Sequence, residues 1–169
     1  MWLPKSKIPQ IAREMVSAIV KAGDIECTSQ AEVAADLESI LNQYLRDESE
    51  VMEKAKDMIQ NRQLPQSHLG KMKKLVADER GFKFGEDAID YLLDQLLEML
   101  MHSGNVEEVY AEDVDMRRKM RVPLRQAEQT DNSLDTEVRG RMKHMKEGSS
   151  TWEIEYHRVL DDIRSRKGL

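Results

Sequence analysis

The sequence predicts an all-α protein of six or seven helices, and three observations support that class. Charged residues make up 34% of the chain, whereas aromatic residues make up only 5%. Strand-rich proteins need more β-branched and aromatic residues than this. Apolar residues recur at helical spacing, and no stretch alternates strictly between apolar and polar residues. We therefore expect two similar helical halves, 1–84 and 85–169, in an elongated or forked shape rather than a compact bundle.

The most apolar stretch, at 88–101, predicts a central and buried helix. A short third helix precedes it and ends at Gly81, and Gly104 follows its last turn. A helix that is apolar over most of its circumference is usually buried on several sides. The apolar positions that carry this prediction are Ile89, Leu92, Leu93, Leu96, Leu97, Met99, Leu100 and Met101.

Two further helices are expected in the first half. An apolar face over 8–20 predicts a first helix that ends at Gly23, a common residue at helix ends. Ser29 and Glu32 have capping-box spacing and begin a long second helix, which ends before Pro65. At 1.5 Å per residue that helix spans roughly 45 Å, which is too long for a compact bundle of this size.

Up to three helices are expected after the central one. The fifth helix follows an acidic turn, and Pro123 is expected to end or kink it. The polar stretch 126–133 is expected to be a flexible linker. A sixth helix contains Val138, and a seventh begins at Ser150 with capping-box spacing to Glu153.

Two alignments of the chain with itself indicate an internal repeat. Residues 8–26 align with 89–107, 81 residues later, and nearly every apolar position matches. Residues 50–82 align with 137–169, 87 residues later, which places an insertion around Pro123 and the linker. In a duplication, the central helix would be the second copy of the first, and the two would pack across a pseudo-symmetry axis. Because any two helical sequences align to some degree, duplication and chance likeness both stand as interpretations.

Charge is sharply segregated in the second half. The net charge of −6 argues against strong non-specific affinity for nucleic acid. Residues 86–115 hold ten acidic side chains and no Lys or Arg, whereas 116–126 hold five basic side chains and no acid. An acidic helix is therefore followed directly by a basic one.

The segregated charges predict ion pairs across an antiparallel hairpin. Three acids and three arginines each recur at every fourth residue, so each set forms a ridge along its helix. In an antiparallel hairpin, facing residues have numbers with a constant sum, and these ridges match about a turn centred between Glu107 and Glu108. The predicted pairs are Asp90 with Arg125, Asp94 with Arg121, and Glu98 with Arg117.

The alternative interpretation of the basic ridge is contact with the phosphates of a nucleic acid, RNA more than DNA. Clustered basic side chains are typical of such a surface. No aromatic residue lies within the cluster to stack on bases. The candidate nucleic-acid contacts are Arg117, Arg118, Lys119, Arg121 and Arg125.

No motif in the sequence points to catalysis. There is no phosphate-binding P-loop, no pair of Glu-x-x-His motifs for two metal ions, and no converging nucleophile and base. We assign no catalytic, cofactor-binding or metal-binding residue and no small-molecule substrate, and we do not expect an enzyme. The single cysteine, Cys27, is typical of a reducing compartment. Because the apolar runs are also far too short to span a membrane, we expect a cytoplasmic protein without membrane contact.

Three segments carry a resemblance to a known family. They read KIPQIAREMVSAIVKAGDIE, LVADERGFKFGEDAIDYLLDQLLEMLMHSGNVEEVYAEDVDMRRKM and TWEIEYHRVL. Together they resemble a bacterial family of uncharacterised helical proteins, domain of unknown function number 507, over almost the whole chain. The opening MWLP departs from the more basic start typical of that family. The resemblance implies an all-α, elongated or forked bacterial cytosolic protein, and it brings no activity or catalytic residue.

Two function hypotheses follow from the sequence. The first is a non-enzymatic cytosolic binding or scaffolding protein, whose helical faces engage another protein or a second copy of this chain. The second is an RNA-associated helical module that uses the basic ridge at 117–125.

Overall fold

A computed structural model of the protein describes residues 2–148 and 150–169, with the side chain of Ser150 left aside. Of these described residues 77% are helical, and only two short strands among them pair in a small sheet, so the all-α class is confirmed. Among the described residues, no helix is both long enough and apolar enough to cross a membrane. The chain forms two compact units, a larger one over 4–125 and a smaller one over 1–3 and 126–169. The predicted division into halves at 84 and 85 stays a prediction.

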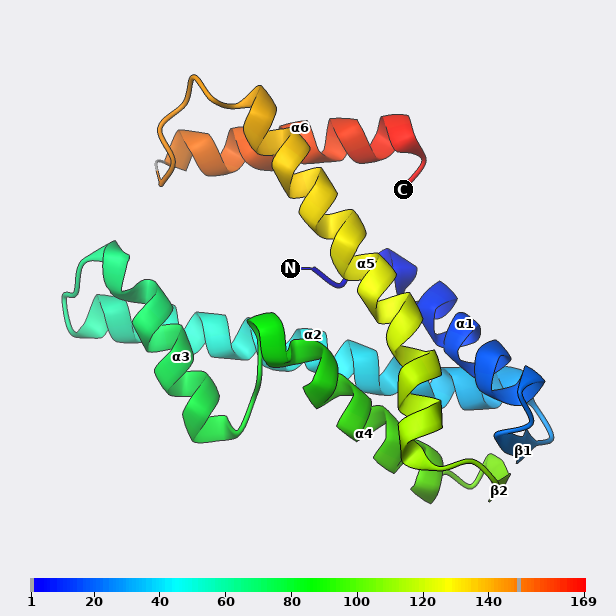
Figure 1. The fold of residues 1–169 in the computed structure, drawn as a ribbon. Coiled ribbons are helices and arrows are strands. Elements are labelled where there is room, and N and C mark those ends of the chain that lie inside the picture. Colours follow the sequence, from blue (N-terminus) through cyan, green and yellow to red (C-terminus); the bar gives the residue numbers. More distant parts are fainter. Residues whose placement is uncertain (1, 149) are drawn as a thin grey trace. The chain divides into compact units, whose positions relative to one another are not determined.

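The larger unit contains most of the elements (Figure 1). Their order along the chain is repetitive, because a 3₁₀ turn, a helix, a short strand and a long helix occur twice. The elements are 3₁₀ turn η1 (Lys5–Lys7), α1 (Ile8–Lys21), β1 (Ile25–Cys27), α2 (Gln30–Asn61), η2 (Gln66–His68), α3 (Leu69–Arg80), η3 (Gly85–Asp87), α4 (Ala88–His102), β2 (Val106–Val109) and the first part of α5 (Asp113–Arg141).

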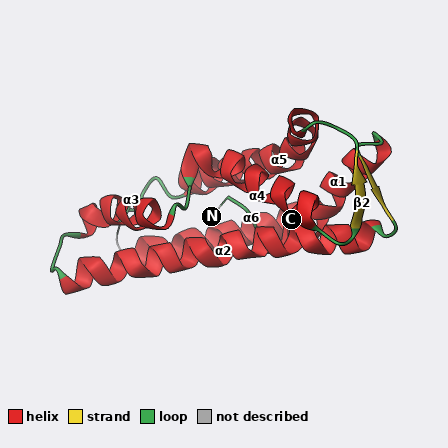
Figure 2. Cartoon of the chain, turned by 90° about the horizontal axis from the view of Figure 1, so that it is seen from below, coloured by secondary structure: helices red, strands yellow, loops and turns green. Residues whose placement is uncertain are grey.

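Helix α2 is the helix on which α1, α3 and α4 of the larger unit pack. It runs without interruption over its 32 residues, so the charged patch at 46–50 does not break it. The hydroxyl of Ser29 accepts a hydrogen bond from the Glu32 amide at 3.3 Å, as the N-cap prediction requires. Helices α1 and α4 pack against α2, and α3 lies beside its second half (Figure 2). Six buried apolar residues of α1 and seven buried residues of α4 supply much of the core.

The sequence did not predict the two strands. β1 and β2 pair antiparallel, with Ile25 opposite Val109 and Glu26 opposite Glu108. The register is irregular beyond Glu26, where Cys27 lies opposite Val106. Strands of three and four residues are too short to show an alternating pattern in the sequence.

The predicted fifth and sixth helices are a single helix. Helix α5 continues from Asp113 to Arg141 with Pro123 inside it, so the expected flexible linker at 126–133 is wrong, and two α-helices rather than three follow α4 in the described residues. Proline removes one backbone hydrogen bond from a helix, and the rest of the ladder can continue on either side. The smaller unit contains the second part of α5 and helix α6 (Ser150–Lys167). The predicted cap at Ser150 lies outside the described side chains.

Candidate interaction surfaces on two helical hairpins

The acidic and basic ridges face each other on α4 and α5, but one helical turn away from the predicted pairing. Arg117 donates from Nη2 to Oδ1 of Asp94 at 2.5 Å, and Arg121 donates from Nη2 to Oδ1 of Asp90 at 2.5 Å. The structure therefore brings Asp94 to Arg117 rather than to Arg121. Glu98, the third predicted acid, is exposed on the same face of α4.

The displaced register has a physical cause in the connection between the two helices. The prediction assumed a symmetric turn. The observed connection instead contains strand β2, which runs aside to pair with β1 before α5 begins. The centre of the connecting residues is therefore not the centre of the hairpin. Arg125, whose predicted partner was Asp90, is exposed at the end of the larger unit.

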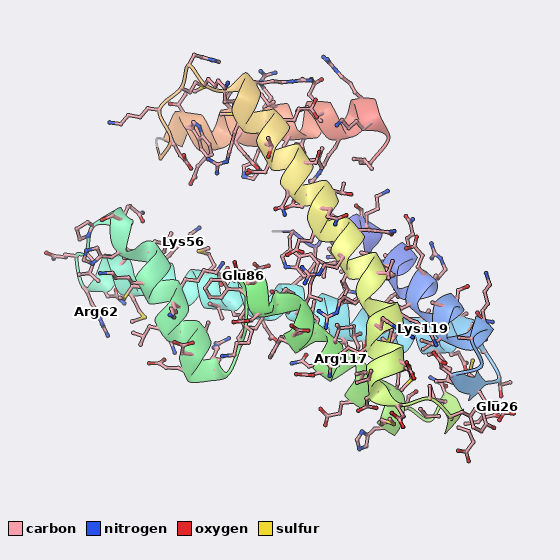
Figure 3. All side chains as sticks on the ribbon, viewed as in Figure 1. Glu26, Lys56, Arg62, Glu86, Arg117 and Lys119 are labelled. Atoms are coloured by element: carbon pink, nitrogen blue, oxygen red, sulfur yellow. The ribbon has the colours of Figure 1, made fainter. Side chains whose placement is uncertain are left out.

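The two other residues of the basic ridge have different surroundings. Arg118 is exposed and pairs with Asp115, three residues earlier on the same helix, at 3.2 Å. Lys119 lies on the side of α5 away from Arg117 (Figure 3) and donates to both carboxylate oxygens of Asp24, at 2.8 and 2.5 Å. Only 7% of the Asp24 side chain is exposed. Four residues of the ridge therefore bind carboxylates of the same chain.

Sequence reasoning missed Asp24. A single acid directly after Gly23 gives no signal of burial, because its partner lies 95 residues later in the chain. Its backbone is also fixed, since the Asp24 carbonyl accepts hydrogen bonds from the amides of Tyr110 and Ala111 at 2.8 and 3.2 Å. Asp24 thus joins the end of α1 to the start of α5.

A second polar cluster has a similar arrangement, but here the long helix carries the hydrogen-bond acceptor and the residue beyond the short helix carries the donor. The amide of Asn105 donates to Oδ2 of Asp36 at 2.9 Å, and the hydroxyl of Ser103 donates to the same oxygen. Asn105 follows Asp24 by 81 residues, and Lys119 follows Asp36 by 83. Each cluster therefore joins the third residue after a short helix to a long helix, at corresponding positions.

The strand junction between these clusters carries a reciprocal pair of hydrogen bonds. Thr28, just after β1, donates from its hydroxyl to Glu107 of β2 at 2.5 Å. Tyr110, just after β2, donates from its hydroxyl to Glu26 of β1 at 2.6 Å. This hydrogen bond, together with the charge of Glu26, raises the pKa of Tyr110.

Residues 43–82, which we call the first hairpin, comprise the second part of α2 and helix α3. Apolar residues are buried along its inner side: Val51, Ala55, Ile59, Val76 and Ala77. Its edge carries ion pairs between the two helices, Arg80 with Glu50 at 2.8 Å and Lys54 with Glu79 at 3.9 Å. Both pairs are largely exposed and fix orientation more than they stabilise.

Residues 126–169, which we call the second hairpin, comprise the second part of α5 and helix α6. Its core consists of Leu134, Val138, Met142, Val159 and Ile163. Lys167 pairs with Glu137 at 2.7 Å, and Arg141 lies 3.8 Å from Asp162. The hydrogen bond from Lys167 holds the pKa of the Glu137 carboxyl below its usual value.

The second hairpin also contains part-buried titratable groups. Tyr156 donates from its hydroxyl to Oδ1 of Asp135 at 2.6 Å. Burial and this hydrogen bond raise the pKa of Tyr156 to about 12. Burial also raises the pKa of Asp131, against the opposing effect of the Arg164 charge.

The buried residues of the two hairpins occupy corresponding positions. Three core residues of α5 follow three of α2 by 83 residues: Leu134 follows Val51, Val138 follows Ala55, and Met142 follows Ile59. Near the ends of α3 and α6 the offset is 87, because Ile163 follows Val76. The six buried residues of α1 likewise correspond to buried residues of α4 at an offset of 81.

The exposed residues of the hairpins differ where the buried ones agree. At the offsets that align the cores, Glu53 corresponds to Thr136, and the charge of Lys54 is replaced by the opposite charge of Glu137. On α3, Lys74 corresponds to Asp161 of α6. The two hairpins thus offer different charge patterns on similar cores.

An open cavity of 560 Å³ lies on the second hairpin. Helix α5 supplies one wall and the end of α6 supplies the other, and the lining residues are Gln126, Gln129, Thr130, Ser133, Leu134, Lys167 and Leu169. No group of three or more His, Cys, Asp or Glu within the described part of the chain is arranged to hold a metal ion.

Comparison with known proteins places the chain in a family. No curated protein matches it. The family model described as Protein of unknown function (DUF507) matches residues 1–169, which confirms the resemblance carried by the three quoted segments. The chain therefore belongs to the DUF507 family, a family of unknown function.

Proposed function

We propose that this protein is a non-enzymatic cytoplasmic scaffold that holds two different protein partners, one on each helical hairpin. One observation carries the proposal: the two hairpins have corresponding buried cores but different exposed charges. A packed core constrains its residues closely, whereas the charges on an exposed face determine which partner that face suits. Two hairpins with similar cores and different exposed charges suit a protein that joins two partners.

The proposal includes an internal duplication as the origin of the two hairpins. The repeated order of elements supports it. So do the two polar clusters, where Asp24 with Lys119 corresponds to Asn105 with Asp36 at the offsets that align the buried helices. Hydrogen-bonded pairs that recur at matching positions, with their donor and acceptor exchanged, support duplication over chance likeness.

The RNA-associated alternative is less well supported. Arg117, Lys119 and Arg121 each donate to a carboxylate of the same chain, so binding a phosphate would first require breaking that ion pair. Exposed Arg118 is held by a neighbour on its own helix, where the geometry leaves the side chain accessible. The measurement that separates the hypotheses is binding of tRNA and duplex DNA as a function of salt concentration. The scaffold hypothesis predicts no saturable binding at physiological salt and no effect of Arg118→Glu.

The scaffold proposal is tested by reversing charge on one hairpin at a time. The variant Glu53→Lys with Asp57→Lys changes an exposed face of α2, and Asp161→Lys with Ser165→Lys changes an exposed face of α6 at the same spacing. Each protein is expressed in cells, cross-linked, recovered and analysed by quantitative mass spectrometry. We expect each variant to lose a different set of cross-linked proteins relative to the unchanged chain.

Thermal melting followed by circular dichroism provides the control, because both variants should keep the stability of the unchanged protein. If the two variants lose the same proteins, the hairpins form one surface and the two-partner proposal fails. If neither variant loses any protein, binding on the hairpins is excluded at these faces and the proposal also fails.

A further inference from the structure

The outer face of the first part of α5 carries exposed apolar residues on both sides of an arginine. Val114 is 72% exposed and Val122 is 53% exposed. The side chain of Arg118, halfway between them in the chain, is 74% exposed. Because residues four apart are neighbours on a helix surface, these three side chains form one continuous strip. We call Val114, Arg118 and Val122 the outer strip.

Ion pairs and buried residues hold the helix behind this strip. Arg117 and Lys119 lie on opposite sides of α5 (Figure 3), and Arg118 lies between them in the chain. Arg117 is bound by Asp94 at 2.5 Å, and Lys119 is bound by Asp24 at 2.5 Å. Three residues on the inner side of this part of α5 are fully buried: Met116, Met120 and Leu124. The outer strip is therefore a preformed surface, and a molecule that docks there has little ordering entropy to overcome.

The corresponding positions of α2 hold small, neutral residues. Buried residues of the two long helices correspond at an offset of 83, since Met120 follows Leu37 and both are fully buried. At the same offset, the outer strip corresponds to exposed Ala31, Ala35 and Ser39. Valine forms helices less readily than alanine, because its branched side chain loses rotamer freedom. The valines of the outer strip therefore add little to the stability of the chain by itself, and they would be buried by a molecule that covers the strip.

Arg118 keeps hydrogen-bond donors for a second carboxylate. A guanidinium group has five N–H donors in a planar fork. Its bond to Oδ1 of Asp115 uses Nη2, at 3.2 Å, and exposed pairs of this kind on one helix are weak. A second exposed arginine, Arg125, lies about two turns beyond Arg118 on the same face. The outer strip thus combines apolar surface with positive charge, so its complement is apolar and acidic.

Neither a second copy of this chain nor a nucleic acid matches the whole strip. Whether two α5 helices pack parallel or antiparallel, the register that brings valine onto valine also places Arg118 opposite Arg118. Like charges in direct opposition disfavour such a contact. The phosphates of a nucleic acid would suit Arg118, but Val114 and Val122 have no group that binds a phosphate.

We propose that the outer strip binds an amphipathic helix of a protein partner, with apolar residues of that helix against Val114 and Val122 and an acidic residue against Arg118. Side chains four apart form the ridges through which helices pack on one another. The partner helix should therefore carry an acidic residue with an apolar residue four positions before it and another four positions after it. Its carboxylate would accept charge-assisted hydrogen bonds from the donors that Asp115 leaves. The strip lies outside both hairpins, so this proposal goes beyond the scaffold function and does not depend on it.

The test uses the full chain and a phage library of helical peptides in which one face is randomised. Peptides selected on the unchanged protein are synthesised, and their affinities are measured by fluorescence anisotropy. Two variants change the strip: Arg118→Glu reverses its charge, and Val114→Ala with Val122→Ser gives it the corresponding residues of α2.

Two matched controls make similar changes on α6. Arg158→Glu alters an arginine that is 67% exposed and pairs with Glu155 three residues earlier, as Arg118 pairs with Asp115. Ile154→Ala alters a branched apolar residue that is 72% exposed, like Val114. All of these side chains are exposed, so thermal melting followed by circular dichroism should show every variant folded.

We expect the selected peptides to carry an acidic residue between two apolar residues at four-residue spacing. Their affinity should fall about tenfold or more in both strip variants and stay within about twofold in both controls. Replacing the acidic residue of a selected peptide with lysine should make it bind Arg118→Glu more tightly than the unchanged protein.

The assignment is overturned if the selected peptides bind the strip variants as well as the unchanged protein, or if no selected peptide is sensitive to the strip. In the second case, saturable tRNA binding that Arg118→Glu removes would assign the strip to nucleic acid instead. The cross-linking experiment changes other elements, α2 and α6, and is read separately. Distinct partner sets there would leave the scaffold proposal standing after a failure here.

Discussion

Replacing Lys119 with Asp should strongly destabilise the larger unit. Lys119 is the cation for Asp24, whose side chain is 7% exposed, and it donates to both carboxylate oxygens at 2.8 and 2.5 Å. Breaking a buried pair by removing one partner typically costs about 3–5 kcal/mol. Because 27% of the Lys119 side chain is exposed, water offsets part of that loss, and we expect about 2–4 kcal/mol.

A second change should recover most of this loss. With Asp24→Asn added to Lys119→Asp, an asparagine after the short helix faces an aspartate on the long helix. Asn105 and Asp36 have that arrangement in the other polar cluster, where the amide donates to the carboxylate at 2.9 Å. The double variant should therefore be more stable than Lys119→Asp alone by about 1–3 kcal/mol, the usual size of a coupling between contacting residues.

Urea unfolding of the unchanged protein, both single variants and the double variant, followed by circular dichroism, gives the four free energies of this cycle. The slope of unfolding free energy against urea should be the same for all four, which shows that only stability has changed. The reasoning is refuted if Lys119→Asp is as stable as the unchanged protein. It is equally refuted if the double variant is no more stable than Lys119→Asp. In that case an asparagine at 24 and an aspartate at 119 do not stabilise each other, as Asn105 and Asp36 are inferred to do.

Three other measurements test the structure at separate places. Val138→Ala should cost about 1–3 kcal/mol, because a fully buried side chain is truncated, and hydrogen exchange should speed up in the second hairpin, whereas exposed Thr136→Ala should do neither. The raised pKa of Tyr156 should add stability that is complete below about pH 10, its ordinary pKa, and is lost as pH rises toward 12. Urea unfolding across that range should show this loss in the unchanged protein, and the Tyr156→Phe variant should lack it. Arg121→Ala should cost no more than about 1 kcal/mol, a difference that 1 M salt should remove, because 60% of its partner Asp90 is exposed.

Features that depend on neighbouring residues could be predicted from the sequence. The buried face of α4 follows from its apolar spacing, and the ends of α2 and α3 follow from Ser29 and Gly81. These signals act within a few residues, where sequence separation and spatial distance are nearly the same. The opposed charges of α4 and α5 were also visible, because their spacing matches that of a helix.

Features decided by distant contacts could not be predicted. The stretch 126–133 has the composition of a linker, yet it is helical, because the buried side chains of Leu124 and Leu134 on either side favour continuation of one helix. The pairing of β1 with β2 and the burial of Asp24 depend on residues about 80 or more positions apart.

The error in the ion-pair register has its origin in the length of the connection between α4 and α5. The connection from α4 to α5 is longer than the connection from α1 to α2 by two residues, since the offset changes from 81 at α4 to 83 along α5. One of the two extra residues of this connection is Glu107, which has no partner in the strand ladder, because Glu26 and Cys27 lie opposite Glu108 and Val106. The remaining change, from 83 to 87, falls between Met142 and Val159, in the turn of the second hairpin and the start of α6. The changes of offset thus lie in connections, where they leave the buried faces in phase.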